Sequence, residues 1–129
     1  MDCACIYIDP DSTPDFVNPV VVVARRSHKC YECGREIVPG ENYECTAGKW
    51  AGEFLRFKTC ADCLSVREAF FCEGFFYGDI WENVEEHIAH VDGMVSEDCL
   101  LDLTKAGRDK VIALIDERWD WIHTMEHIK

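Results

Sequence analysis

The segment 28–36 reads HKCYECGRE and places two cysteines two residues apart, followed at once by Gly34. The segment 59–63 reads TCADC and repeats this spacing, which gives the pattern C-x2-C-x26-C-x2-C. A tetrahedral zinc ion takes four donors at about 2.3 Å from sulfur. Two thiolates two residues apart can reach one ion where the chain reverses in a tight turn, and glycine permits the backbone of such a turn. The spacing predicts one zinc ion bound by Cys30, Cys33, Cys60 and Cys63.

Three interpretations of these four cysteines stay open. Redox chemistry is typical of a single CxxC beside a βαβ pattern, whereas this chain has two pairs separated by a hairpin pattern. Unmetallated buried thiols are another alternative. We favour structural zinc, because four thiolates fill the shell and leave no position for the water that a catalytic zinc keeps. Zinc binding then contributes folding free energy on the order of 10 kcal/mol, so losing the metal should unfold the surrounding module.

Five of the nine cysteines lie outside this pattern. The reducing cytosol disfavours disulfides, and an odd number of cysteines cannot pair completely within one chain. A second metal site has three candidate ligands, Cys3, Cys5 and Cys72, to which His28 or Cys45 could be added. The alternative is that Cys45, Cys72 and Cys99 are buried and behave as small hydrophobic residues.

Short β-branched or alternating runs precede Cys60, and longer helical patterns follow it. These patterns, with a Pro-Gly turn at 39–40, predict strands at 20–24, 35–38, 41–46 and 53–59. Prolines place 9–19 in an extended loop, and glycines predict a turn at 47–52. Helices are expected at 61–71, 79–90, 96–103 and from Thr104 onward, with Asp79 capping the second. The predicted fold class is α+β: a small zinc-ribbon-like β module followed by a helical C-terminal half.

The predicted organisation has two parts, a zinc-binding β-rich module with an N-terminal extended arm at 1–78 and an acidic helical region packed on it at 79–129. The net charge of −12 is uneven, because residues 1–63 hold 7 Lys/Arg against 10 Asp/Glu and residues 64–129 hold 6 against 15. An acidic surface repels phosphate, which argues against general nucleic-acid binding by the C-terminal half. The charge favours a basic protein partner, or simply solubility.

The composition favours a folded protein in the cytoplasm. Of the 129 residues 48% are hydrophobic and four are Trp, which is unlike a disordered chain. No apolar run approaches the ~20 residues of a membrane span, so we expect no membrane partner. The first ten residues, MDCACIYIDP, lack the basic lead and long apolar run of a secretory signal.

The stretch HKCYECGREIVPGENYE…GKWAGEFLRFKTCADCLSVREAFFCEGFFYGDIWE resembles small four-cysteine zinc-binding proteins encoded by bacteriophages and prophages. The resemblance covers residues 24 to about 90 and leaves the C-terminal helices out. It implies zinc at the four paired cysteines and a viral origin, hence the cytosol of a bacterial host. It implies no activity.

The predicted C-terminal helix carries an apolar stripe of Val111, Ile112, Ile115, Trp119 and Ile122. Its spacing also places four polar residues on one face, namely Asp116, Asp120, His123 and His127. A solvated surface is favoured over a metal site there, because no HExxH motif is present. We expect one of Trp119 and Trp121 to be core and the other to join a partner surface, unless both pack internally. The candidate partner surface is Asp116, Asp120 and Trp121.

Two binding functions and one enzymatic function are weighed. The favoured hypothesis is a non-enzymatic protein that acts through protein–protein binding. Its acidic helices would mimic nucleic acid and inhibit a host defence or nucleic-acid-processing protein such as a CRISPR effector. An enzyme is disfavoured, because the metal site is closed and no nucleophile–base set is recognisable. The sequence predicts no oligomeric state.

The alternative is a zinc-ribbon nucleic-acid-binding or transcription-accessory protein. Basic residues cluster around the first cysteine pair with one aromatic residue among them, as single-strand binding would use. They are Arg25, Arg26, Lys29 and Arg35, with Tyr31, and Lys49, Trp50, Arg56 and Lys58 could extend them. The net charge of −3 for residues 1–63 argues against this alternative.

Overall fold

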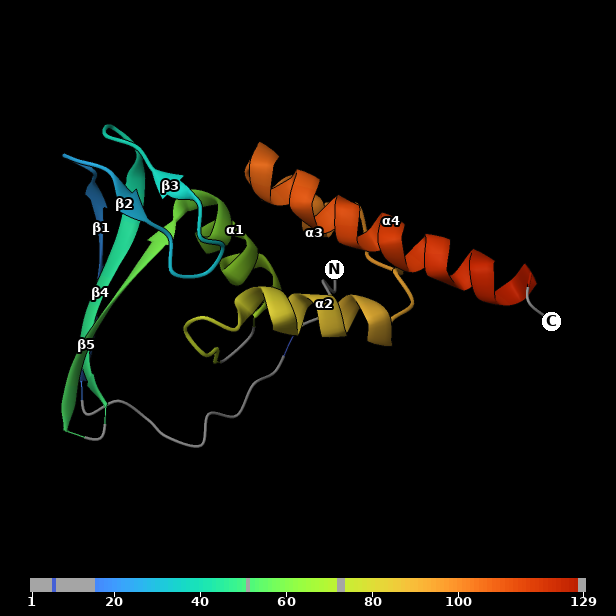
Figure 1. The fold of residues 1–129 in the computed structure, drawn as a ribbon, viewed down its shortest axis with the longest axis horizontal. Coiled ribbons are helices and arrows are strands. Elements are labelled where there is room, and N and C mark those ends of the chain that lie inside the picture. Colours follow the sequence, from blue (N-terminus) through green and yellow to red (C-terminus); the bar gives the residue numbers. More distant parts are fainter. Residues whose placement is uncertain (1–5, 7–15, 51, 72–73, 128–129) are drawn as a thin grey trace.

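The computed structural model describes residues 6, 16–50, 52–71 and 74–127, and it confirms the α+β class (Figure 1). Five strands come first: β1 Phe16–Val23, β2 His28–Lys29, β3 Glu36–Ile37, β4 Asn42–Trp50 and β5 Glu53–Cys60. Four helices follow: α1 Ala61–Phe70, α2 Ile80–His90, α3 Asp98–Leu101 and α4 Lys105–His127. Figure 1 shows the strands at one end of the molecule and α2 and α4 at the other, with α1 between them.

Three antiparallel strands in the order β1-β4-β5 form the main sheet, and β2 pairs with β3 in a separate two-stranded ribbon. The predicted strand at 53–59 is confirmed as β5. Residues 47–50, expected to form a turn, instead continue β4 to Trp50. Here pairing with strands on both sides overrides the turn propensity of Gly48, which lies opposite Val17 of β1 and Leu55 of β5.

Strand β1 is an edge strand and contains Pro19, where the sequence predicted a loop. The backbone N–H of Ala24 donates to the Glu41 carbonyl at 2.8 Å. Because N–H direction alternates along a strand, the even-numbered residues of β1 direct their N–H toward β4 and the odd-numbered residues, which include Pro19, face away from it. A proline at such an edge position removes no hydrogen bond from the ladder. The expected loop was wrong for residues 16–19.

Side chains alternate between two faces of the main sheet. On one face, Glu44 and Thr46 are buried, and Arg67 of α1 donates to Glu44 Oε2 at 2.6 Å. Phe57 stacks on Tyr77 on the same side, with ring centroids 4.4 Å apart. We call this the covered face. The opposite set of side chains is the open face, made by Val20, Val22, Tyr43, Cys45, Ala47, Lys49, Phe54, Arg56 and Lys58. Only its end at Tyr43 is buried, against Ala24, Cys30 and Ile37.

The helices pack around one apolar core. Its buried members are Ile6, Val66, Phe70, Ile80, Val84, Ile88, Cys99, Leu103 and Val111. The predicted helices agree with α1, α2 and α4 to within a residue or two, whereas α3 is shorter than the expected 96–103. Among the described residues, no helix combines the length and the apolar character that crossing a membrane requires.

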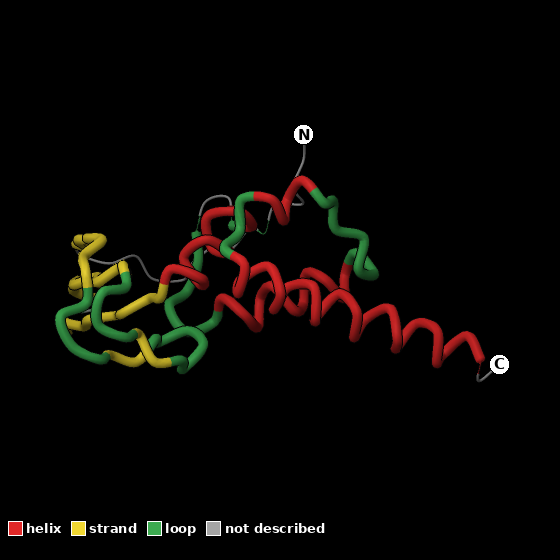
Figure 2. The backbone as a smooth tube through the Cα atoms, turned by 90° about the horizontal axis from the view of Figure 1, so that it is seen from above, coloured by secondary structure: helices red, strands yellow, loops and turns green. Residues whose placement is uncertain are grey.

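Helix α4 is most deeply buried in its N-terminal half. Val111 is fully buried, and it is the last buried residue of α4 among those whose side chains are described, up to Glu126. Figure 2 shows the C-terminal half extending beyond the other elements. The predicted apolar stripe is correct as a pattern but is not a buried stripe, since Ile112 and Trp119 are 36% and 37% exposed. The segment after α2 touches this half without burying it: Arg118 pairs with Asp92 at 2.8 Å, and Gly93 lies against the Trp119 ring.

Candidate metal centre

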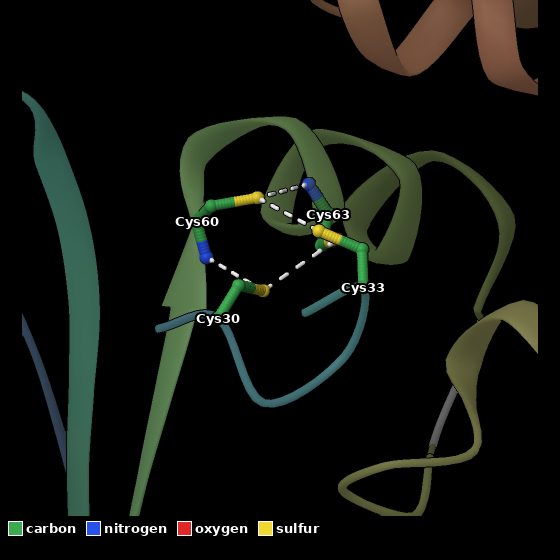
Figure 3. Close-up of side chains that lie close together, drawn as sticks. All are labelled: Cys30, Cys33, Cys60 and Cys63. Carbon is green, nitrogen blue, oxygen red and sulfur yellow. Dashed lines mark hydrogen bonds between the residues drawn. The ribbon is translucent and has the colours of Figure 1, made fainter. Parts of the chain in front are cut away.

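The four paired cysteines converge on one point, as the spacing predicted (Figure 3). Their Sγ atoms all lie within 4.8 Å of one another. The Cys30 and Cys63 Sγ atoms are 3.8 Å apart, and those of Cys33 and Cys60 are 3.9 Å apart. A tetrahedral ion with sulfur ligands at about 2.3 Å separates its ligands by roughly 3.8 Å. The thiols therefore fit a metal ion such as zinc, and they form the only such group among the described residues.

Two chain reversals position these thiols. The first lies between β2 and β3, where the Gly34 N–H donates to the Cys30 carbonyl at 2.9 Å. Gly34 has a φ of 77°, a left-handed conformation that side chains disfavour, so the glycine after Cys33 is required by the turn. The second reversal joins β5 to α1, with Cys60 as the N-cap of the helix. Each pair thus presents its thiols from a chain reversal, as expected.

In the described part of the chain, three N–H groups donate to the sulfur atoms. The backbone N–H of Cys60 donates to Cys30 Sγ at 3.3 Å, and that of Cys63 donates to Cys60 Sγ at 3.5 Å. The indole N–H of Trp81, from α2, donates to Cys63 Sγ at 3.2 Å. Such bonds offset the surplus negative charge of four thiolates around a divalent ion. Sequence reasoning missed Trp81, because nothing in the spacing places α2 beside the second pair.

The thiols influence one another's protonation. The pKa of Cys30 is lowered, chiefly because the Cys60 and Cys63 thiols hydrogen-bond to it. The pKa of Cys60 is raised to about 11 and that of Cys63 is raised further, in both cases mainly by the bond to Cys30. One thiolate therefore forms readily and opposes the next, since like charges at this distance repel. A bound cation would remove that opposition, which is the electrostatic reason to expect a metal among four clustered thiols.

The loop of the first pair also holds the start of α2. Glu32, which stands between Cys30 and Cys33, accepts hydrogen bonds from the backbone N–H of Gly78 at 2.9 Å and of Ile80 at 3.4 Å. Burial raises the pKa of Glu32. The predicted cap Asp79 makes no side-chain cap bond. Instead, the Glu32 carboxylate, 48 residues before Ile80 in the chain, caps the start of α2. Helix N-termini favour negative charge.

The second pair is linked to α4 in a similar way. Asp62, beside Cys63, accepts a hydrogen bond from Thr104 Oγ1, which in turn accepts from the Gly107 N–H at 3.1 Å in the first turn of α4. Arg35 donates from Nε to the other Asp62 oxygen at 3.1 Å and pairs with Glu41 at 2.9 Å. These bonds raise the pKa of Arg35, with Glu41 as the main cause. The centre thus contacts the sheet, α1, α2 and α4.

The other predicted ligands do not join this centre. Cys3, Cys5 and Cys72 lie outside the described residues. Cys45 is a free, partly buried thiol outside the four-thiol group. Cys99 is buried but disulfide-bonded, which corrects the expectation of an unpaired thiol there.

His28 packs on Tyr43, and its Nδ1 lies 3.0 Å from Lys58 Nζ, so it does not reach the four sulfur atoms. Partial burial lowers the pKa of His28, and the positive charges of Lys58 and Arg26 lower it further. The neutral ring therefore belongs to the sheet surface rather than to the metal centre.

The candidate partner surface lies on the projecting half of α4. Asp116, Asp120 and Trp121 are all exposed, and the Arg118 guanidinium lies 4.2 Å from the centroid of the Trp121 ring. Trp119 and Trp121 are 37% and 50% exposed, so the expectation that one of them is core was wrong.

The fold and the centre define an α+β protein with a four-thiol site that fits a structural metal ion. Comparison with known protein families, curated proteins and solved structures finds no match to this chain. The comparisons therefore show no family and no phage origin for this chain.

Proposed function

We propose that this chain is a zinc-stabilised, non-enzymatic binding protein whose acidic helical part docks on a basic protein. The supporting observation is the part of α4 beyond its last fully buried residue, residues 112–126, which we call the α4 tip. It presents large apolar side chains to solvent between carboxylates. Trp119, Trp121 and Met125 are 37%, 50% and 45% exposed.

Zinc is the proposed metal because four thiolates are its usual structural ligand set and complete its tetrahedral shell. Cys60 and Cys63 are fully buried, Cys30 is 1% exposed and Cys33 is partly buried, so three of the four proposed ligands are shielded from solvent. A four-thiolate shell that leaves no position for water contributes stability rather than catalysis. This supports the non-enzymatic part of the proposal.

The shape beside the α4 tip suits an inserted partner side chain. A hollow of about 460 Å³ lies along one side, lined by Gly93, Met94, Val95, Ser96, Leu100, Ile112, Ile115 and Trp119. A smaller one of about 170 Å³ lies along the other, lined by residues that include Leu114 and Trp121. Tryptophan beside a hollow is typical of interaction hot spots.

Charge selects the class of partner. The α4 tip carries four carboxylates, at 116, 117, 120 and 126, against the single cation Arg118. Residues 61–127 as a whole carry 16 Asp/Glu against 5 Lys/Arg. A surface of this sign is complementary to a groove that evolved to hold nucleic acid, and attraction across such a pair speeds association. The proposed occupant is therefore the nucleic-acid groove of a host defence or processing enzyme, of which a CRISPR effector is an example, and the phage-type resemblance agrees with this.

A displacement experiment tests this proposal. The probe is a CRISPR effector carrying a fluorescently labelled nucleic acid in its basic groove, and the readout is loss of anisotropy as unlabelled protein is added. We expect the wild type to displace the probe at about 50 mM salt and to need roughly tenfold more protein at about 300 mM, because screening weakens charge attraction. Absence of displacement at low salt would contradict mimicry for that effector class.

Charge-reversal variants locate the surface. Replacing Asp116 and Asp120 by Lys should weaken displacement far more than replacing Asp98 and Asp102 by Lys, which makes the same change of net charge on and beside α3. Trp121→Ala should weaken it by roughly tenfold or more. Equal losses in both charge variants would show that net charge alone acts, and the α4 tip would not be the site.

A further inference from the structure

The open face of the main sheet carries a one-sided set of charges. Lys49 lies opposite Phe54, and the neighbouring positions on this face place Arg56 opposite Ala47 and Lys58 opposite Cys45. The strands β1, β4 and β5 contain only two carboxylates, Glu44 and Glu53. Both stand at alternate positions that belong to the covered face, because Glu44 pairs with Thr59, and Glu53 with Trp50. The open face therefore combines three strand cations with no strand carboxylate.

Two more cations extend this face at the end of β1. Arg25 and Arg26 are exposed, and with Val22, Val23, His28 and Tyr43 they line a wide, shallow hollow of about 900 Å³. Val22 and Tyr43 belong to the open face, and His28 contacts Lys58 and Tyr43. The hollow is thus continuous with the strand cations. It is larger than the two hollows beside the α4 tip, and none of its lining residues belongs to α4.

An exposed aromatic ring completes the set. Phe54 is 71% exposed, the most of any large hydrophobic residue described, and Lys49 Nζ lies 5.3 Å from the centroid of its ring. A ring beside cations on a flat sheet is the arrangement on which unpaired bases stack while phosphates contact the cations. Tyr31 and Trp50, which the sequence grouped with this surface, instead contact Phe57 on the covered face, and Arg35 is engaged by Glu41 and Asp62.

We infer that the open face binds single-stranded nucleic acid, with Arg25, Arg26, Lys49, Arg56 and Lys58 on phosphates and Phe54 against a base. The net charge of −12 does not prevent this. The excess carboxylates belong to the helical part, and Figure 1 shows α2 and α4 on the far side of α1 from the sheet. Charges further apart than about 8 Å are largely screened at physiological salt. This inference does not rest on the function proposed for the α4 tip, which uses other residues.

The test is fluorescence anisotropy with the full chain and two labelled 20-mers, oligo-dT and oligo-U. Both should bind, and the matching duplex should bind at least roughly tenfold more weakly, because its bases cannot reach Phe54. With five phosphate contacts, log K should fall with log salt at a slope of about −3.5. Comparing the affinities for oligo-dT and oligo-U shows whether the open face prefers single-stranded DNA or single-stranded RNA.

Matched variants make the test specific. Arg25→Gln with Arg26→Gln should make the slope shallower by about 1.4, and Arg56→Gln alone by about 0.7. Lys105→Gln, which removes one exposed cation from α4, should change nothing. Phe54→Ala should weaken binding by roughly five- to 150-fold, whereas Trp121→Ala, which removes an exposed aromatic residue from α4, should not. Circular dichroism of each variant confirms that it folds.

Several results would overturn the inference. One is that neither strand binds at about 50 mM salt, and another is that the duplex binds as tightly as the single strands. A third is that the α4 variants Lys105→Gln and Trp121→Ala lose as much affinity as the open-face variants. Sedimentation gives a further one. If the chain self-associates, binds no strand, and loses the association in the Arg25/Arg26 variant, the open face takes the acidic helices of a second copy instead of nucleic acid.

Discussion

The sheet part and the helical part of this molecule carry opposite charge. Residues 16–60 hold 7 Lys/Arg against 5 Asp/Glu, whereas residues 61–127 hold 5 against 16. The four-thiol centre lies where the two parts meet, and it contacts the first through Cys30 and the second through the indole of Trp81. The net charge of the whole chain therefore describes neither the sheet surface nor the helical surface. The four-thiol centre holds these two differently charged parts together.

The largest expected effect follows from removing the metal. A strong chelator, or Cys60→Ser, should unfold the sheet part and loosen α2, because a structural zinc contributes on the order of 10 kcal/mol and a domain of this size has about 5–15 kcal/mol in total. Circular dichroism and elemental analysis measure the loss. Cys45→Ser is the matched control, since this free thiol lies outside the cluster and its loss should leave the bound metal unchanged. A fully folded protein without bound metal would contradict the central role of the site.

The ion pair between the sheet and α1 comes next. Arg67 and Glu44 are 9% and 6% exposed and pair at 2.6 Å. Replacing Arg67 by Met leaves a buried carboxylate without its partner, which typically costs about 3–5 kcal/mol. Urea denaturation measures this change. A double variant, Arg67→Met with Glu44→Leu, should recover much of the loss, and failure to recover it would show that the pair matters for packing rather than for charge.

The two halves of α4 should respond differently to truncation. Val111→Ala removes fully buried apolar surface and should cost about 1.5–3 kcal/mol. Trp121→Ala, although it removes a much larger side chain, should cost less than about 0.5 kcal/mol, because surface substitutions rarely exceed that. Thermal unfolding of both variants compares the two costs. A large loss in the second would mean that the α4 tip is not free for a partner.

Local patterns predicted more of this fold than long-range contacts did. The cysteine spacing gave the site, and helical periodicity gave α1, α2 and α4, because both depend on residues close in sequence. The strand at 16–19 was missed because a proline predicts a loop unless the strand is known to lie at a sheet edge, where proline is tolerated. The roles of Trp81 and Glu32 were missed for a different reason. Each acts on a segment tens of residues away, and only the folded chain brings the pairs together.

Glu32 gives the sharpest comparison between the two parts, with an effect expected to be smaller than that of Val111→Ala. It stands in the sheet part but caps α2, so Glu32→Gln should leave the metal bound and weaken only the helix. Loss of a cap costs about 0.5–2 kcal/mol. Amide hydrogen exchange should quicken at the first turn of α2 and stay slow in β4 and β5, because those strands pair independently of this carboxylate. If exchange quickened equally in both parts, the centre would hold them as one cooperative unit, and the contrast between the two parts would be one of charge alone.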